Sequence, residues 1–165
     1  MFELKKLPRS GVEKALQKAD RYRLLNEPSD AESICRDILA VDPGNRQAHV
    51  ALVLSLTDQF GRDGGPDPEQ VLRELAALGD EYERAYYGGI VCERAGKAAL
   101  NRRGPGALYG AYDWFRRAMD HFEDAQRIRP EGADEALLRW NTCARLLNHR
   151  RDLQPAPESA PTLLE

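Results

Sequence analysis

Apolar residues recur every three or four positions over most of the chain, which is the period of helices with one buried face. Two starts, at Ser10 and Ser29, place a hydroxyl three residues before a glutamate, a typical helix-capping arrangement. Asp67 followed by Pro68 indicates a third start. With Gly and Pro as stops, the pattern predicts seven helices, at 11–26, 30–41, 46–60, 68–78, 80–102, 107–129 and 133–151.

The composition agrees with an all-α fold. The chain has 21 Ala and 21 Leu but only 13 Val, Ile and Thr together, too few β-branched residues for a sizeable sheet. We expect a lead-in at 1–10, one helical domain at 11–151 and a disordered Pro-rich tail at 152–165. Its 165 residues, 42% of them hydrophobic, suffice for one domain with a real core.

Charge and cysteine content narrow the range of partners and compartments. The formal net charge of -3 offers no general attraction to nucleic acid or anionic lipid, so we expect neither as a partner. Three widely spaced cysteines, Cys35, Cys92 and Cys143, form no metal-binding motif and fit buried thiols in a reducing compartment. No apolar stretch is long enough for a membrane span. We therefore expect a cytoplasmic protein without metal or cofactor.

A spaced pattern of small and aromatic residues stands near the end of the chain. Ala118, Phe122 and Ala125 are followed by Pro130, where alanines would let two helices approach, the phenylalanine would fill the space beside them and the proline would end the helix. This pattern resembles the second helix of a tetratricopeptide (TPR) repeat. A looser match lies earlier, at Ala31, Cys35, Ile38 and Pro43. The part of the chain between these two segments resembles the repeat only weakly.

The resemblance implies a superhelix of about three antiparallel helix pairs followed by a C-terminal capping helix. Pro43 and Pro130 are 87 residues apart, whereas two repeats of about 34 residues would span about 68. Most of the surplus falls in the third pair, on both sides of Gly104–Gly106. We therefore expect an elongated third hairpin.

The resemblance also implies a concave groove, lined by the first helix of each pair, that binds a peptide or helix of a partner protein. Such a partner would supply apolar anchors, and acidic residues that meet arginine. The alternative is that some of these side chains only contact neighbouring helices. The Lys and Asn pattern with which chaperone-binding members hold a terminal carboxylate is missing, because Leu16, Asp20 and Ala51 stand in its place. The groove candidates are Leu16, Asp20, Arg23, Val50, Leu54, Asp58, Tyr87, Val91 and Arg94.

A secondary surface is indicated on the last two helices. Tyr109 and Trp114 lie off the apolar stripe of the third hairpin, and exposed aromatic residues beside arginines are typical of docking surfaces. Arg139 and Arg145 belong to the polar face of the last helix. The plainer alternatives are that the aromatics complete the hairpin core and that the arginines are simply solvated.

No sequence motif points to catalysis. The loop 61–68 lacks the ending of a phosphate-binding loop and the alternating ligands of a calcium loop. The three histidines are isolated from one another and from any nucleophile motif. We predict a non-catalytic interaction module that is a monomer or weak homodimer. The alternatives are a dedicated chaperone or assembly factor for one partner, and a self-associating structural protein.

Overall fold

The computed structural model describes residues 1–102 and 104–157, and the regular elements of these residues are all helices. The predicted all-α class is confirmed, and each predicted helix is present with ends shifted by no more than four residues. The α-helices are α1 (Val12–Leu24), α2 (Pro28–Val41), α3 (Arg46–Thr57), α4 (Pro68–Glu74), α5 (Glu81–Leu100), α6 (Ala107–Ile128) and α7 (Glu135–His149). Two short 3-10 helices are η1 (Arg9–Gly11) and η2 (Leu75–Ala77).

The predicted helix caps are only partly correct. The side chain of Asp67 accepts a hydrogen bond from the backbone N–H two residues on, as expected. The Ser10 and Ser29 caps were wrong: α1 has Gly11 at its N-cap, and α2 already begins at Pro28. Proline favours the first helical position because its fixed φ suits a helix and it has no N–H to leave unsatisfied there. The short 3-10 turn likewise moves the start of α1 past Ser10.

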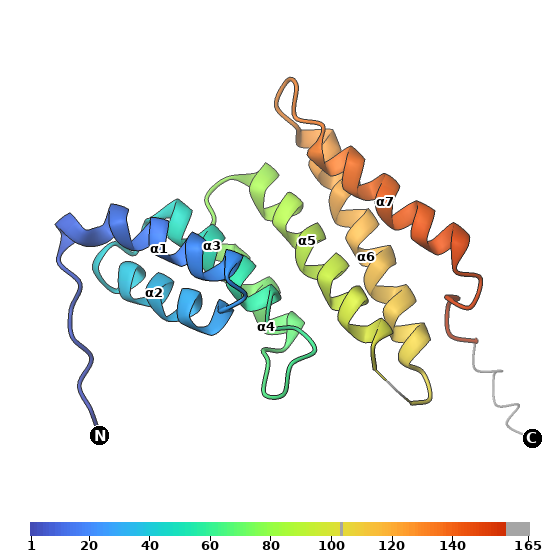
Figure 1. Cartoon of the computed structure of the whole chain (residues 1–165). Helices are drawn as coiled ribbons and strands as arrows, with labels where there is room; N and C mark the ends of the chain where they lie inside the picture. Colours follow the sequence, from blue (N-terminus) through green and yellow to red (C-terminus); the bar gives the residue numbers. More distant parts are fainter. Residues whose placement is uncertain (103, 158–165) are drawn as a thin grey trace, which may run out of the picture.

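The helices pack in chain order as neighbouring hairpins (Figure 1). α1 packs on α2, α2 on α3, and α5 on α6, which in turn carries α7. The odd-numbered helices α1, α3 and α5 also contact one another in succession, so they share one face of the molecule. α5 has 20 residues and α6 has 22, against 13 in α1 and 14 in α2. The expected elongation of the third hairpin is confirmed.

Small side chains hold the paired helices together. Ala31, Ala118 and Ala125 are completely buried, as expected for residues that let two helices approach, and so is Ala19 of α1. Large side chains such as Phe115 and Phe122 fill the space beside them in α6. Leu108, which the helical period also places on that buried stripe, is instead partly exposed, because it lies in the first turn of α6.

The chain beyond α7 keeps contact with the helical domain. Leu153 is buried and packs with Ala99 and Ala111 in a small core cluster between the third hairpin and α7. Arg150 and Asp152 form an ion pair with a distance of 2.7 Å between Nη2 and Oδ2. Residues 152–157 form no regular element, but Leu153 within them is buried; the tail boundary at 152 stays a prediction. Residues 158–165 of that tail lie outside the described residues.

Candidate functional site

A hollow with a volume of about 370 Å³ lies between α1, α3 and α5. Among the groove candidates, Leu16 and Asp20 of α1, Val50 and Leu54 of α3, and Tyr87 of α5 line it. Within each helix the candidates are spaced three or four residues apart, which places them on one side of the helix. The structure therefore brings five of the nine candidates together, and their role in binding stays a prediction.

Val91 is the exception on α5. Its side chain is completely buried and packs in the core with Leu52 and Leu56 of α3 and Val71 of α4. The expectation that Val91 lines the groove was therefore wrong. Its helical spacing places it correctly beside Tyr87, but α3 and α4 lie against that part of α5 and leave no open surface.

The three remaining candidates form an ion-pair cluster at the end of α3. The Nε of Arg23 lies 2.8 Å from a carboxylate oxygen of Asp58, and Arg94 pairs with the other oxygen of the same carboxylate. Arg94 also donates to the Thr57 hydroxyl at 2.6 Å. Burial lowers the pKa of Arg94, and Asp58 opposes this effect. The cluster joins α1, α3 and α5 through one carboxylate, so both arginines already have a partner within the chain.

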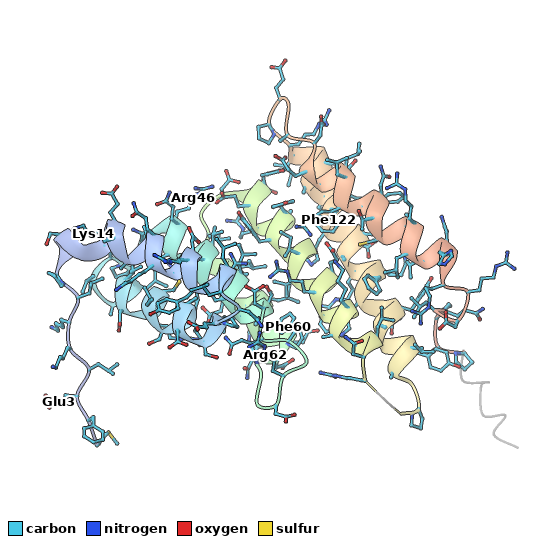
Figure 2. All side chains as sticks on the ribbon, viewed as in Figure 1. Glu3, Lys14, Arg46, Phe60, Arg62 and Phe122 are labelled. Carbon is cyan, nitrogen blue, oxygen red and sulfur yellow. The ribbon has the colours of Figure 1, made fainter. Side chains whose placement is uncertain are left out.

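The hollow also has polar edges, formed by residues that were not among the predicted groove candidates. Glu13, Gln17, Arg46 and Gln47 also line it. Arg46 pairs with Glu83 of α5, with 2.8 Å between Nε and Oε2, and Figure 2 shows it at the first turn of α3. Glu13 and Asp20, by contrast, are exposed and take part in none of the ion pairs formed by the described residues. The spacing of Glu13 and Gln17 from Leu16 and Asp20 already places all four on one stripe of α1.

A second hollow extends the first along the end of α1. It has a volume of about 500 Å³ and is lined by Asp20, Arg23, Leu24, Asn26 and Asp58. Asp20 lines both hollows, which makes them neighbouring parts of one groove. Leu24 is 88% exposed at its edge and adds an apolar side chain to this end. We call the two hollows together the α1–α3–α5 groove.

The aromatic part of the predicted secondary surface is divided. Tyr109 is exposed as expected, in the first turn of α6. Trp114 is half-buried and packs against the core clusters, with the guanidinium of Arg117 4.4 Å from its ring centroid. Arg117 in turn pairs with Glu69 of α4. Arg117 therefore joins α6 to α4, and Trp114 lies against this arginine within α6.

The arginine part of this surface is also divided. Arg139 faces α5, where its Nη1 lies 2.8 Å from Oε2 of the buried Glu93 and its Nε donates to the Tyr86 hydroxyl at 3.3 Å. Lys97 pairs with the same carboxylate. The placement of Arg139 on an outer face was therefore wrong, because a buried carboxylate on α5 attracts it inward. Arg145 is exposed on α7.

All three cysteines are buried as expected, and burial raises the pKa of the thiols of Cys35, Cys92 and Cys143 to about 11, 12 and 12. These thiols stay protonated and unreactive at neutral pH. Within residues 1–102 and 104–157, no cluster of three or more His, Cys, Asp or Glu could hold a metal ion. No helix of the same residues is long and apolar enough to cross a membrane.

Comparisons with protein-family models, with curated proteins and with solved structures found no match to this chain.

Proposed function

We propose that this protein is a non-catalytic interaction module with a TPR-like arrangement, which binds a peptide or helix of a partner protein in the α1–α3–α5 groove. The observation that carries the proposal is the hollow of about 370 Å³ itself, with half-buried Leu16, Val50, Leu54 and Tyr87 at its base. Ligand pockets of proteins are typically clefts of some 300 Å³ or more that combine apolar side chains with a few polar groups, and the lining of this hollow contains both kinds of side chain.

The packing of the helices supports the TPR-like part of the proposal. In such a repeat array the first helices of successive pairs lie side by side and form the binding face. Here α1, α3 and α5 contact one another in that way, and the buried alanines lie between the two helices of a pair. The even-numbered helices α2 and α6 then support this face from behind.

The charges of the groove indicate the chemistry of the partner. Arg23 and Arg94 are already paired with Asp58, so a carboxylate of a partner would have to compete with that contact. Glu13 and Asp20 are exposed and free of such pairing among the described residues. We therefore expect a partner segment with apolar anchors and a lysine or arginine beside them. This reverses the sign of charge that the sequence alone suggests.

A peptide library displayed on phage tests the proposal directly. The full chain and its Leu54→Asp variant are used as bait, with Leu138→Asp as a matched control because Leu138 is 62% exposed on α7, away from the groove. We expect the wild type and the control to enrich the same peptides, with apolar and basic residues. The Leu54→Asp variant should enrich none of them.

A second variant separates loss of binding from loss of fold. Leu54 contacts the core, so circular dichroism must show that Leu54→Asp keeps its helices. Asp20→Lys changes only an exposed side chain of the same groove and should select peptides with acidic residues in place of basic ones. Identical enrichment by the wild type and by folded Leu54→Asp would contradict a groove-binding function.

A further inference from the structure

The segment before η1 exposes its apolar side chains to solvent. Residues 1–8 form no regular element, Phe2 is fully exposed and Leu4 is 88% exposed. Figure 1 shows this segment leading away from α1 and α2, and Figure 2 shows Glu3 well outside the helical body. Moving apolar side chains of this size out of water lowers the free energy, so the segment is suited to bind an apolar surface.

The chemistry of the segment complements that of the groove. Phe2 and Leu4 are two residues apart and fall on one side of an extended chain, as anchors for an apolar floor must. Lys5 and Lys6 follow immediately and carry the charge opposite to that of Glu13 and Asp20. An apolar pair followed by a basic pair is the combination that we expect in a partner of this groove.

The length of the segment fits as well. Residues 2–7 span about 20 Å when fully extended. Packed helices lie about 8–10 Å apart, so the path from α1 across α3 to α5 is also about 20 Å. Six residues are therefore enough to cross the α1–α3–α5 groove.

The backbone before η1 is extended, and the segment leads away from α1 and α2 (Figure 1). Pro8 is extended, with φ -68° and ψ 143°. A residue before proline is also held in an extended conformation, which applies to Leu7. Leu7 lies against the start of the helix, since a Cβ added at Gly11 would be 3.2 Å from its Cδ1. A reversal over α1 would break this arrangement, whereas the groove of another molecule needs none.

We propose that residues 2–7 of one copy of this chain occupy the α1–α3–α5 groove of a second copy. Phe2 and Leu4 lie on the apolar floor, and Lys5 and Lys6 meet Glu13 and Asp20. Each copy has both a segment and a groove, so two copies exchange their segments reciprocally. This inference rests on the proposed function, because it names the occupant of the same groove.

A labelled synthetic peptide with the sequence of residues 1–10 tests the contact. The receptor is the full chain with Phe2→Asp and Leu4→Asp, whose own segment no longer competes. We expect saturable binding by fluorescence anisotropy, and a loss of about tenfold to a hundredfold when Phe2 of the peptide becomes Asp. Asp20→Lys in the receptor should weaken binding, and Lys5→Glu with Lys6→Glu in the peptide should restore it. Such rescue requires direct pairing of these charges.

Analytical ultracentrifugation tests the second copy. The wild type should pass from monomer to dimer as concentration rises, and so should Leu138→Asp. The segment variant (Phe2→Asp, Leu4→Asp) and the groove variant (Leu54→Asp) should each stay monomeric alone. A mixture of the two should regain association, because one copy still supplies a groove and the other a segment.

The results that would overturn this inference differ from those that would overturn the proposed function. A peptide that does not bind, or that binds the Leu54→Asp and Asp20→Lys receptors unchanged, overturns the inference. A wild type that stays monomeric while only the segment variant binds peptide shows that each segment occupies its own groove, which overturns exchange between copies. Library peptides that still depend on Leu54 would in either case leave the proposed function standing. Enrichment that does not depend on Leu54 would contradict both this inference and the proposed function.

Discussion

The crossing of α5 over α6 has no room for one additional methyl group. Gly89 of α5 lies against Phe122, and a Cβ at this position would lie 2.7 Å from the Cζ of the phenylalanine ring and closer still to two other ring carbons. Carbon atoms in contact normally stand about 3.5–4.0 Å apart. The Gly89→Ala variant must therefore displace the ring by about 1 Å.

The ring has little space in which to move. Phe122 is completely buried, and its ring centroid lies 6.2 Å from that of Tyr86 on α5. Overpacking of a core by one methyl group costs about 1–3 kcal/mol. Alanine returns about 0.5–1 kcal/mol because it is the better helix former. We expect a net loss of up to about 2.5 kcal/mol, with a central value of about 1 kcal/mol, and a fall in Tm of about 2–4 °C for each kcal/mol lost.

Gly110 of α6 provides the matched control. A Cβ at this helical position meets no atom within 4 Å. Gly110→Ala should therefore stabilise the protein by about 0.5–1 kcal/mol. Urea denaturation followed by circular dichroism measures both variants. If Gly89→Ala is as stable as Gly110→Ala, the close crossing of α5 and α6 is wrong.

Three other sites give measurable outcomes. Burial, with Arg117 nearby, lowers the pKa of His121 below its usual 6.5. As the pH falls, the unfolded chain therefore binds a proton at this histidine before the folded chain does, and the free energy of unfolding should fall below about pH 6.5. In His121→Asn, the midpoint of urea unfolding should change less between pH 7 and pH 5 than in the wild type. Arg139→Ala removes one of the two cations at the buried Glu93 and should cost about 1–3 kcal/mol by urea denaturation; a combined Glu93→Gln change should recover part of that loss. Leu153→Ala should cost about 2 kcal/mol in a thermal melt, and an unchanged Tm would show that this residue belongs to a loose tail.

The helices could be predicted because their determinants are local. The apolar period and the stop residues fix where a helix lies, and the spacing of Ala118, Phe122 and Ala125 already marks the face that pairs. The capping serines failed because Pro28 and a 3-10 turn compete for the same starts. Gly88 and Gly89 give no period of their own, so the closest helix contact was not visible in the sequence.

The groove could be predicted only in part because it depends on which helix lies opposite. Spacing places Tyr87 and Val91 on one side of α5, yet only the packing of α3 and α4 decides that Val91 is buried. The ion pair of Arg94 and Asp58 joins residues that are 36 positions apart, so no local sequence pattern predicts it. Arg139 shows the same dependence, because its orientation follows a buried carboxylate on another helix.

The two halves of the molecule differ in how far other helices cover their apolar surface. In the C-terminal half, α7 packs on α6, and Arg139 reaches the carboxylate and hydroxyl groups of α5, which leaves that part of the face occupied. In the N-terminal half no helix of the described residues fills the hollow between α1, α3 and α5 or the second hollow at the end of α1. The most exposed large apolar side chains of the described residues also lie there, at Met1, Phe2, Leu4 and Leu24. Substitution of Arg139, which joins α7 to α5, should therefore change stability, whereas substitution of the exposed groove residues Glu13 and Asp20 should change association while the fold remains.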